Sequence, residues 1–361
     1  MKRKLYTTWS IVLFLIILPV RAQKNLEAVF RDNEYQLTGV AISENQRLFT
    51  CYPYWNESHR YGVVEILPDG KAVPYPDEAW NNWKDGEDGK DKFVCPQAVW
   101  VDEKNHLWVV DPANPFFKGT VSGAVKIIAF DLENNTLYKT IFLPADIAGP
   151  GSYINDIRVD NKRQIAYLTN SNEGSIIVVD IVTGGAWKFL DRHYSTKSDS
   201  TYQFKPGGKI WADEQGRKQV HADGIALDLN GKYLYYKALT DDKLYRIKTK
   251  NLRNYYIKEN KMHRKVEDLG HVASSDGMVF DRNGFLYLGD IEKNAIIRFN
   301  PGNKRTEVVL QDTSLIWPDS YAVSQDGYLY IACSQIHQMP AFNHGKNQRT
   351  SPFSIYRIKI N

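Results

Sequence analysis

Residues 277–289 read GMVFDRNGFLYLG, an apolar run that breaks at a polar turn and resumes as a second apolar run. Apolar segments on both sides of an Asp/Asn/Gly turn predict a β-hairpin. Five other segments share this plan: GVAISENQRLFTC (39–51), AVWVDEKNHLWVV (98–110), DIRVDNKRQIAYL (156–168), GIALDLNGKYLYY (224–236) and SYAVSQDGYLYIA (320–332). The chain therefore contains one hairpin repeated six times.

The spacing of the six hairpins indicates how they are arranged. The intervals between their turn residues are 59, 58, 68, 53 and 43 residues, which is the size of a repeat that forms a four-stranded blade. A third strand-like segment follows each hairpin. The pattern predicts an all-β fold, a six-bladed β-propeller. Because each blade of a propeller packs only on its neighbours, residues 23–361 are expected to form a single domain.

Two segments outside the repeat have their own roles in this prediction. Residues 26–30 (LEAVF) are strand-like, and we expect them to close the ring by pairing with the last C-terminal strands. The polar stretch 193–220 accounts for the longest interval between hairpins. It is predicted to be an insertion loop over one face of the ring.

The N-terminal residues 1–22 have the plan of a secretory signal. A basic start (KRK) precedes the apolar run 11–18, and Ala22 supplies a small residue at the last position. An uncleaved membrane anchor is the alternative, but the run is shorter than the roughly 20 residues that cross a bilayer. We therefore predict a secreted protein, extracellular or periplasmic, with no membrane attachment after cleavage.

The charge of the mature chain argues against nucleic acid as a partner. The full sequence has 46 basic and 42 acidic residues, and removing residues 1–22 takes away four basic ones, which leaves 42 of each. A chain with no net positive charge and no clustered Lys/Arg stripe lacks the electrostatic surface that attracts phosphates. A small-molecule ligand is the expected partner.

Three cysteines, Cys51, Cys95 and Cys333, lie in the mature chain. Cys51 ends the second strand of the first hairpin and Cys95 stands just ahead of the next blade, so a disulfide between adjacent blades is one interpretation in an exported protein. Three buried thiols are the other. The spacing matches no structural zinc motif.

One polar side chain stands directly ahead of each hairpin, five residues before its turn. The first strand of each propeller blade lines the central channel, so these side chains are expected to form a ring at one mouth. The ring residues are Thr38, Gln97, Asn155, Asp223, Asp276 and Asp319. Clustered carboxylates need a cationic neutraliser, either a hard divalent cation such as Ca²⁺ or a protonated amine. Alternatively, these residues only bond backbone amides where strands begin.

The loops after the second strands return to the same mouth, because a tight turn sends the chain back to the face it left. They carry Trp55, Asn114 and Asn172, so the mouth should be polar at its base and partly aromatic at its rim. His221 stands two residues before Asp223, on the same side of an extended segment. It is a candidate general base, and a solvated loop histidine is the alternative.

Longer stretches carry a resemblance to a known family. The runs LFTCYPYW (48–55), GVVEILPDGKAVPYP (62–76), VWVDEKNHLWVVDPAN (99–114), HADGIALDLNGKYLYYKAL (221–239) and WPDSYAVSQDGYLYIACSQI (317–336) occur in this order. Together they resemble the Yellow and major royal jelly protein family. The resemblance implies a secreted six-bladed propeller with a small-molecule pocket at one end of its channel. It also implies either conversion of dopachrome or binding of biogenic amines.

A second similarity is to the six-bladed gluconolactonase and senescence-marker-protein superfamily, which holds a divalent metal at first-strand starts. Asn155 in YINDIRVD and Asp276 in SSDGMVFDRNG match an Asn and the Asp of that metal set. Asp223 stands where the second Asn belongs, and Thr38 stands where the Glu belongs. The similarity implies a metal site of Asn155, Asp223 and Asp276, with Ca²⁺ or another hard divalent cation as cofactor.

These observations leave several functions open. The first is an enzyme that acts on an aromatic or quinone-type molecule, related to dopachrome conversion, with Asp223, Asp276 and His221 as catalytic residues. A metal-dependent, lactonase-like hydrolase and a non-catalytic binding or scaffold protein are the alternatives. The residues predicted to contact the ligand are Gln97, Asn155, Asp319, Trp55, Asn114 and Asn172.

Overall fold

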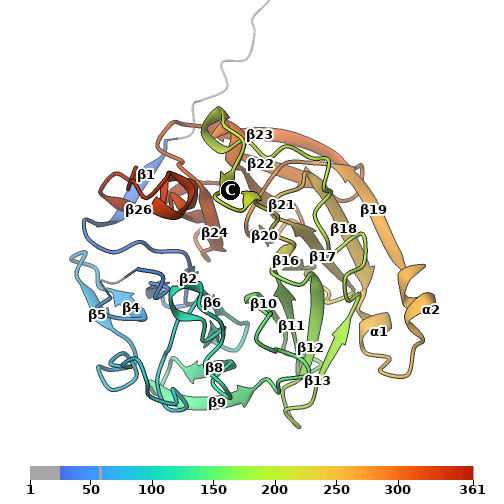
Figure 1. Cartoon of the computed structure of the whole chain (residues 1–361), viewed down its shortest axis with the longest axis horizontal. Coiled ribbons are helices and arrows are strands. Elements are labelled where there is room, and N and C mark those ends of the chain that lie inside the picture. Colours follow the sequence, from blue (N-terminus) through green and yellow to red (C-terminus); the bar gives the residue numbers. More distant parts are fainter. Residues whose placement is uncertain (1–24, 57–58, 361) are drawn as a thin grey trace, which may run out of the picture.

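The computed structural model describes residues 25–56 and 59–360, and six four-stranded antiparallel sheets form a ring in it (Figure 1). In each sheet the strand nearest the centre comes from the beginning of one hairpin repeat. This arrangement confirms the predicted all-β, six-bladed β-propeller. The predicted signal segment, residues 1–22, lies outside the described residues.

The first three blades use consecutive strands, ordered from the channel outward. Blade 1 contains β2 (Val40–Ile42), β3 (Leu48–Cys51), β4 (Val63–Ile66) and β5 (Ala72–Pro74). Blade 2 contains β6 (Ala98–Val101), β7 (His106–Asp111), β8 (Lys126–Asp131) and β9 (Thr136–Phe142). Blade 3 contains β10 (Ile154–Asp160), β11 (Ile165–Asn170), β12 (Ser175–Asp180) and β13 (Ala186–Phe189).

The last three blades complete the ring. Blade 4 contains β16 (Ala222–Leu227), β17 (Tyr233–Ala238), β18 (Lys243–Lys248) and β19 (Val266–His271). Blade 5 contains β20 (Met278–Phe280), β21 (Leu286–Asp290), β22 (Ala295–Asn300) and β23 (Arg305–Gln311). Blade 6 contains β24 (Pro318–Val323), β25 (Tyr328–Cys333), β26 (Phe353–Lys359) and the N-terminal β1 (Glu27–Asp32). The pairing of β1 with β26 is the ring closure expected from residues 26–30 (Figure 1).

The remaining elements are short. The insertion loop carries the hairpin of β14 (Ala212–Asp213) and β15 (Gly216–Arg217). The helices α1 (Thr249–Leu252) and α2 (Glu259–His263) lie at the outer edge of blade 4 (Figure 1). The 3₁₀ turns are η1 (Pro115–Phe117), η2 (Pro206–Gly208), η3 (Ile291–Lys293), η4 (Ile336–Gln338) and η5 (Pro340–Phe342). None of the helices in the described residues is both long and apolar enough to cross a bilayer.

The hydrophobic core is divided among the interfaces between neighbouring blades. Strand β7 illustrates the reason, because its successive side chains point to opposite faces of the sheet. Leu107 and Val109 pack against blade 1, whereas Trp108 and Val110 pack against blade 3. Each blade therefore buries two apolar faces, and this is why the inner strands read as continuous apolar runs rather than alternating ones.

The inner strands approach one another closely, and small residues make this possible. A Cβ added at Gly224 would lie 2.1 Å from the backbone oxygen of Asp276 on the next blade. One added at Gly277 would lie 2.7 Å from the backbone oxygen of Asp319. The ring residues thus stand immediately before positions where backbone meets backbone.

The cysteines do not form the disulfide that was one interpretation of the sequence. Cys51, Cys95 and Cys333 are all buried free thiols. Cys51 packs in the interface between blades 1 and 2, whereas Cys95 packs in the interface between blades 2 and 3. The two thiols therefore belong to different apolar clusters. Burial raises the pKa of Cys51 to about 12, so this thiol stays protonated.

Candidate functional site: the channel mouth

A cavity of about 400 Å³ opens at one mouth of the channel. Four of the six ring residues line it, namely Gln97, Asn155, Asp223 and Asp276. The predicted rim residues Trp55, Asn114 and Asn172 line it as well. A cavity of this size accommodates a small molecule, and the convergence of polar groups in an aromatic setting is typical of a ligand site.

Irregular strand pairing directs the ring side chains. The register between β10 and β11 shifts between Ile154 and Ile157, on both sides of Asn155. The register between β16 and β17 shifts in the same way between Ala222 and Ile225, around Asp223. A bulge places an extra residue in one strand and re-aims a side chain. The polar residue at each of these strand starts is thereby turned out of the regular ladder.

A chain of hydrogen bonds crosses the floor of the cavity. Asn155 Nδ2 donates to Asp223 Oδ2 at 2.8 Å. Asp223 in turn hydrogen-bonds Asp276, whose Oδ2 accepts from Trp317 Nε1 at 2.8 Å. Asp223 and Asp276, called the carboxyl pair below, are thus held together by donors from blade 3 and from the start of blade 6.

The carboxyl pair is poorly neutralised by the protein itself. Burial raises the pKa of Asp223 well above its usual range, and the adjacent carboxylate of Asp276 raises it further. Burial raises the pKa of Asp276 to about 6, although hydrogen bonds from Asp223 and Trp317 oppose the change. The two raised pKa values indicate that Asp223 is protonated and donates a hydrogen bond to Asp276, since two buried carboxylates in contact do not both ionise readily.

Two buried cations lie in the same region, but their donors are used elsewhere. Lys237 Nζ donates to three backbone carbonyls at 2.5, 2.8 and 3.3 Å. Arg158 donates to Asp156 at 2.8 Å and to the backbone carbonyl of Met278 at 2.6 Å. Their charges act on the carboxyl pair only at a distance. Among the described residues, the acids at the floor of the cavity therefore have no contacting counter-ion.

The donor set does not fit the predicted divalent-cation site. Calcium takes six to eight oxygen ligands, yet Asn155 turns its N–H toward Asp223 and the indole N–H of Trp317 occupies an oxygen of Asp276. In the part of the chain that the structure describes, no group of three or more His, Cys, Asp or Glu side chains could hold a metal ion. We assign no chemical step to a metal at Asn155, Asp223 and Asp276.

One side of the cavity is built from aromatic side chains of blades 1 to 3. Trp55 stacks on Phe117 with ring centroids 5.1 Å apart, and Phe117 lies 6.0 Å from Tyr153. Trp55 Nε1 donates to the Tyr153 hydroxyl at 2.9 Å, and that hydroxyl donates to Gln97 Oε1 at 2.8 Å. Gln97 therefore anchors an aromatic wall. Phe117 and Tyr153 were not among the residues predicted from the sequence.

A second aromatic group comes from the insertion loop and from blade 6. The indole of Trp211 lies 5.1 Å from Trp317 and 4.6 Å from the ring of Phe342. All three line the cavity. Trp317 belongs to the WPDSY run and stands two residues before the ring residue Asp319. This position in the sequence could have indicated that Trp317 lies near the mouth. Trp211 lies in an irregular loop, where no local pattern indicates that it folds back over the mouth.

The structure places the other predicted site residues outside the cavity lining. Asp319 is buried beside Ser320, which donates to it at 3.1 Å. His221 Nδ1 accepts from the backbone N–H of Ser198 at 3.1 Å, and its Nε2 lies against Lys197. Burial and the Lys197 ammonium lower the pKa of His221 to about 4. The imidazole is thus occupied by loop contacts, a geometry that does not favour a general base acting on a ligand.

Thr38 and two of the rim carboxamides also have structural partners. Thr38 does not line the cavity, and its Oγ1 donates to the backbone oxygen of Gln97 at 2.8 Å. Asn114 Oδ1 accepts from the N–H of Gly119 at 2.9 Å, and Asn172 Nδ2 donates to the carbonyl of Gly151 at 2.8 Å. The two carboxamides therefore shape the rim loops while they line the cavity.

Comparison with solved structures shows that other proteins share this fold. It aligns over 94% of its length with 90% of a gluconolactonase from Xanthomonas campestris, with a TM-score of 0.58 and 12% identity. It aligns over 94% of its length with 94% of a calcium-binding regucalcin from Agrobacterium tumefaciens, with a TM-score of 0.56 and 12% identity. Likeness at such low identity shows a shared fold and nothing about shared chemistry.

Sequence relatives are more informative. The chain is 24% identical over 324 residues to a Yellow-related salivary protein of Lutzomyia longipalpis, which covers 81% of this chain and 76% of that protein. It is 24% identical over 251 residues to Major royal jelly protein 5 of Apis mellifera, covering 65% of this chain. It is 24% identical over 321 residues to Protein yellow of Drosophila guanche, covering 82%. The matches span 39% and 54% of these last two relatives.

The family model described as Major royal jelly protein matches residues 94–361, from the segment before blade 2 to the C-terminus. The match includes most of the ring residues and both segments that carry Trp211 and Trp317. The six-bladed propeller, the ordered sequence runs and this match lead to one conclusion: the chain belongs to the major royal jelly protein family.

Proposed function

We propose that this protein binds a small aromatic molecule that carries a protonated amine. The single observation that supports the proposal is the buried carboxyl pair, Asp223 and Asp276, which no cation within residues 25–56 and 59–360 contacts. An ammonium group bound there would be the counter-ion of the pair, and its positive charge would stabilise the ionised form of the carboxyl groups. Secretion, inferred from residues 1–22, is part of the same proposal.

The walls of the cavity suit the other end of such a ligand. Trp55 and Phe117 lie on one side, and Trp211 and Trp317 come from different segments of the chain. Aromatic faces attract both flat rings and organic cations. A volume of about 400 Å³ is enough for one bicyclic ring with a short side chain.

Isothermal titration calorimetry with 2-phenylethylamine and its neutral analogue 2-phenylethanol tests the charge requirement. We expect the amine to bind at least roughly 10-fold more tightly, because 1.4 kcal/mol separates each factor of ten. Asp223→Asn and Asp276→Asn should weaken the amine by roughly 10- to 100-fold and leave the alcohol almost unchanged. Asp69→Asn is the matched control, since Asp69 is an exposed aspartate in the turn between β4 and β5 and does not line the cavity. Equal binding of amine and alcohol would refute the proposal.

A second candidate function is favoured by the hydrogen bond within the carboxyl pair. Two contacting carboxyl groups with different protonation states can act as an acid and a base. In a tautomerisation of a quinone-type molecule such as dopachrome, the ionised Asp276 would take a proton from carbon. The protonated Asp223 would return one to oxygen, with no net oxidation or reduction.

Loss of dopachrome absorbance over the uncatalysed rate measures this second function. Conversion that disappears in both Asp223→Asn and Asp276→Asn, and persists in Asp69→Asn, would identify the protein as an enzyme. Amine binding without conversion would leave a binding protein. A lactonase-type function is not proposed, because the metal that its mechanism requires does not fit the donor set of the ring.

A further inference from the structure

The insertion loop forms a roof over the mouth, and its hairpin places an ion pair in the cavity lining. Lys218 N donates to the backbone oxygen of Trp211 at 3.0 Å, which closes the hairpin of β14 and β15. Lys218 Nζ then reaches Asp213 Oδ2 across the hairpin at 2.8 Å. Both side chains line the same cavity as the carboxyl pair. They are partly exposed, at 32% for Lys218 and 19% for Asp213.

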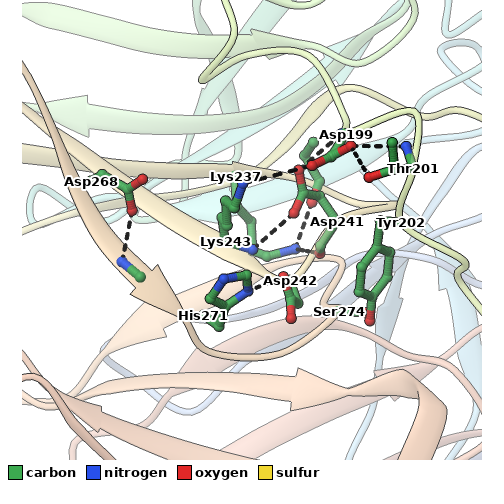
Figure 2. Close-up of polar contacts among 12 residues, drawn as sticks. Asp199, Thr201, Tyr202, Lys237, Asp241, Asp242, Lys243, Asp268, His271 and Ser274 are labelled. Carbon is green, nitrogen blue, oxygen red and sulfur yellow. Dashed lines mark hydrogen bonds and ion pairs between the residues drawn. The ribbon is translucent and has the colours of Figure 1, made fainter.

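The roof is attached to the propeller by polar contacts, so its position is well defined. The backbone N–H of Asp199 donates to Asp241 Oδ2 at 3.0 Å. The hydroxyl of Tyr202 lies 2.6 Å from Ser274 Oγ and donates to Glu292 Oε2 at 2.6 Å. Figure 2 shows Asp199 near Asp241 and Tyr202 near Ser274. Groups that are fixed before a ligand arrives recognise it with a smaller entropy cost.

The aromatic packing adds a second attachment. Trp211, directly before β14, is buried against Phe204 and Trp317. The hairpin therefore leaves the aromatic wall at a fixed point. Asp213 ends β14, and Lys218 directly follows β15. The hairpin therefore holds both side chains in the cavity lining.

The chemistry of the ion pair suits an oxygen substituent. An ammonium group has three donors, and the contact with Asp213 uses one of those of Lys218. The second oxygen of Asp213 accepts from the N–H of Gln215 at 2.9 Å, and a carboxylate oxygen can accept a further donor. A phenol or catechol hydroxyl can both accept from Lys218 and donate to Asp213, whereas an unsubstituted ring can do neither.

The two ends of the cavity also carry different charge. Its floor is acidic because of Asp223 and Asp276, whereas the ion pair of Lys218 and Asp213 leaves the roof without net charge. Electrostatic complementarity fixes the orientation of a bound molecule more than it adds affinity. A protonated amine is attracted to the acidic floor, so the ring of an aryl-alkylamine is directed toward the roof.

We propose that Asp213 and Lys218 are specificity-determining residues that recognise a hydroxyl or quinone oxygen on the ring of the ligand. The inference rests on the proposed binding of an aromatic amine at the floor. It narrows the ligand class from aromatic amines in general to amines with an oxygenated ring.

Three probes that differ only in ring hydroxyls test the inference: 2-phenylethylamine, tyramine and dopamine. Calorimetric titration of the purified protein should give an affinity 5- to 30-fold higher for tyramine or dopamine than for 2-phenylethylamine. Lys218→Met should reduce this ratio to less than about 2-fold and change the affinity for 2-phenylethylamine little. Lys209→Met, in an exposed part of the same loop, is the matched control and should preserve the ratio.

The outcomes separate this inference from the proposed function. Measurable but equal affinity for the three amines in the wild-type protein would overturn the role of the roof and leave the floor intact. A ratio that survives in both Lys218→Met and Asp213→Asn would overturn it as well. No binding of any of the three amines would overturn the proposed function, and this inference would fall with it.

Discussion

Blade 2 and the floor of the mouth cavity each bury aspartate near lysine, and the two regions compensate the charges differently. In blade 2, Asp111 and Lys126 are register partners on β7 and β8, and Lys126 Nζ donates to Asp111 Oδ2 at 3.0 Å. Both side chains are fully buried. At the floor, Lys237 is equally buried but gives its donors to backbone carbonyls.

The difference shows how buried aspartates can either stabilise the fold or form a ligand site. Asp111 also accepts from the backbone N–H groups of Val94, Cys95 and Ala113 at 2.8, 3.0 and 2.9 Å. It is saturated by the protein and has no capacity for a ligand. The carboxyl pair has no contacting cation in the part of the chain that the structure describes, and it faces a cavity. Unmet charge next to open volume, rather than the aspartate itself, marks the functional region.

The largest effect should come from breaking the saturated pair. Lys126→Met leaves the Asp111 carboxylate buried without its cation, a change that costs about 3–5 kcal/mol in comparable pairs. We expect a loss of this size in the free energy of unfolding, measured by urea titration. Lys71→Met, at an exposed position, should change it by less than about 0.5 kcal/mol. A small effect of Lys126→Met would mean that the two regions do not differ as described.

A smaller loss is expected from the lysine beneath the floor. Lys237→Met removes a donor from three backbone carbonyls, but it also relieves the cost of burying a charge, since burial lowers the pKa of Lys237 to about 8. We expect a net loss of about 1–3 kcal/mol in the free energy of unfolding. The removal also takes away a positive charge that favours ionised Asp276, so the pKa of Asp276 should rise further. Urea unfolding together with the pH dependence of amine binding measures both effects. If Lys237→Met is as costly as Lys126→Met, Lys237 is a true counter-ion of the floor.

The carboxyl pair should lower stability at neutral pH. The pKa of Asp276 is raised to about 6 in the folded protein, so the native state binds this proton more tightly than the unfolded chain, where it ionises near 3.9. The stability that protonation contributes is complete below the unfolded value and is lost as pH rises through 6.

Asp276→Asn should therefore stabilise the folded protein, in contrast to substitutions in the Asp111–Lys126 pair. At pH 7 the variant should be about 1–3 kcal/mol more stable than the wild-type protein, and the difference should shrink toward pH 4.5. Asp111→Asn should be destabilising over the same range, because Asp111 has its full set of partners. Urea unfolding at pH 4.5, 5.5 and 7 gives the measurement. A difference that does not depend on pH would contradict an elevated pKa at Asp276.

The smallest effect is expected from metal ions. Since the floor residues are turned toward one another and toward Trp317, adding 1 mM Ca²⁺ or excess EDTA should change the melting temperature by less than about 1 °C. A ligand that binds only the folded state raises that temperature, so an amine that binds at the floor should do so under either condition. A saturable rise with Ca²⁺ that is lost in Asp276→Asn would restore the metal site.

The sequence by itself determined the ring and most of its contents. Six hairpins with regular spacing, the strand at residues 26–30 and the polar register before each hairpin were sufficient to predict a six-bladed propeller with Asn155, Asp223 and Asp276 around one channel. These are local properties. Alternation, turn residues and spacing record which faces of each strand are buried, and they do so independently of the partner strand.

Only the tertiary structure decided which ring residues line the cavity and which charged side chains are paired within the protein. Asp319 and Thr38 share the register of Asp223 but lie outside the lining. Strand irregularity does not explain the difference, since the pairing shifts around Asp319 as it does around Asp223. Contacts between blades, such as the bond from Thr38 to the backbone oxygen of Gln97, orient each side chain separately. The roof with Lys218, and the carbonyls that occupy Lys237, come from segments distant in sequence. Charge compensation depends on distances between such segments, and a one-dimensional pattern does not contain those distances.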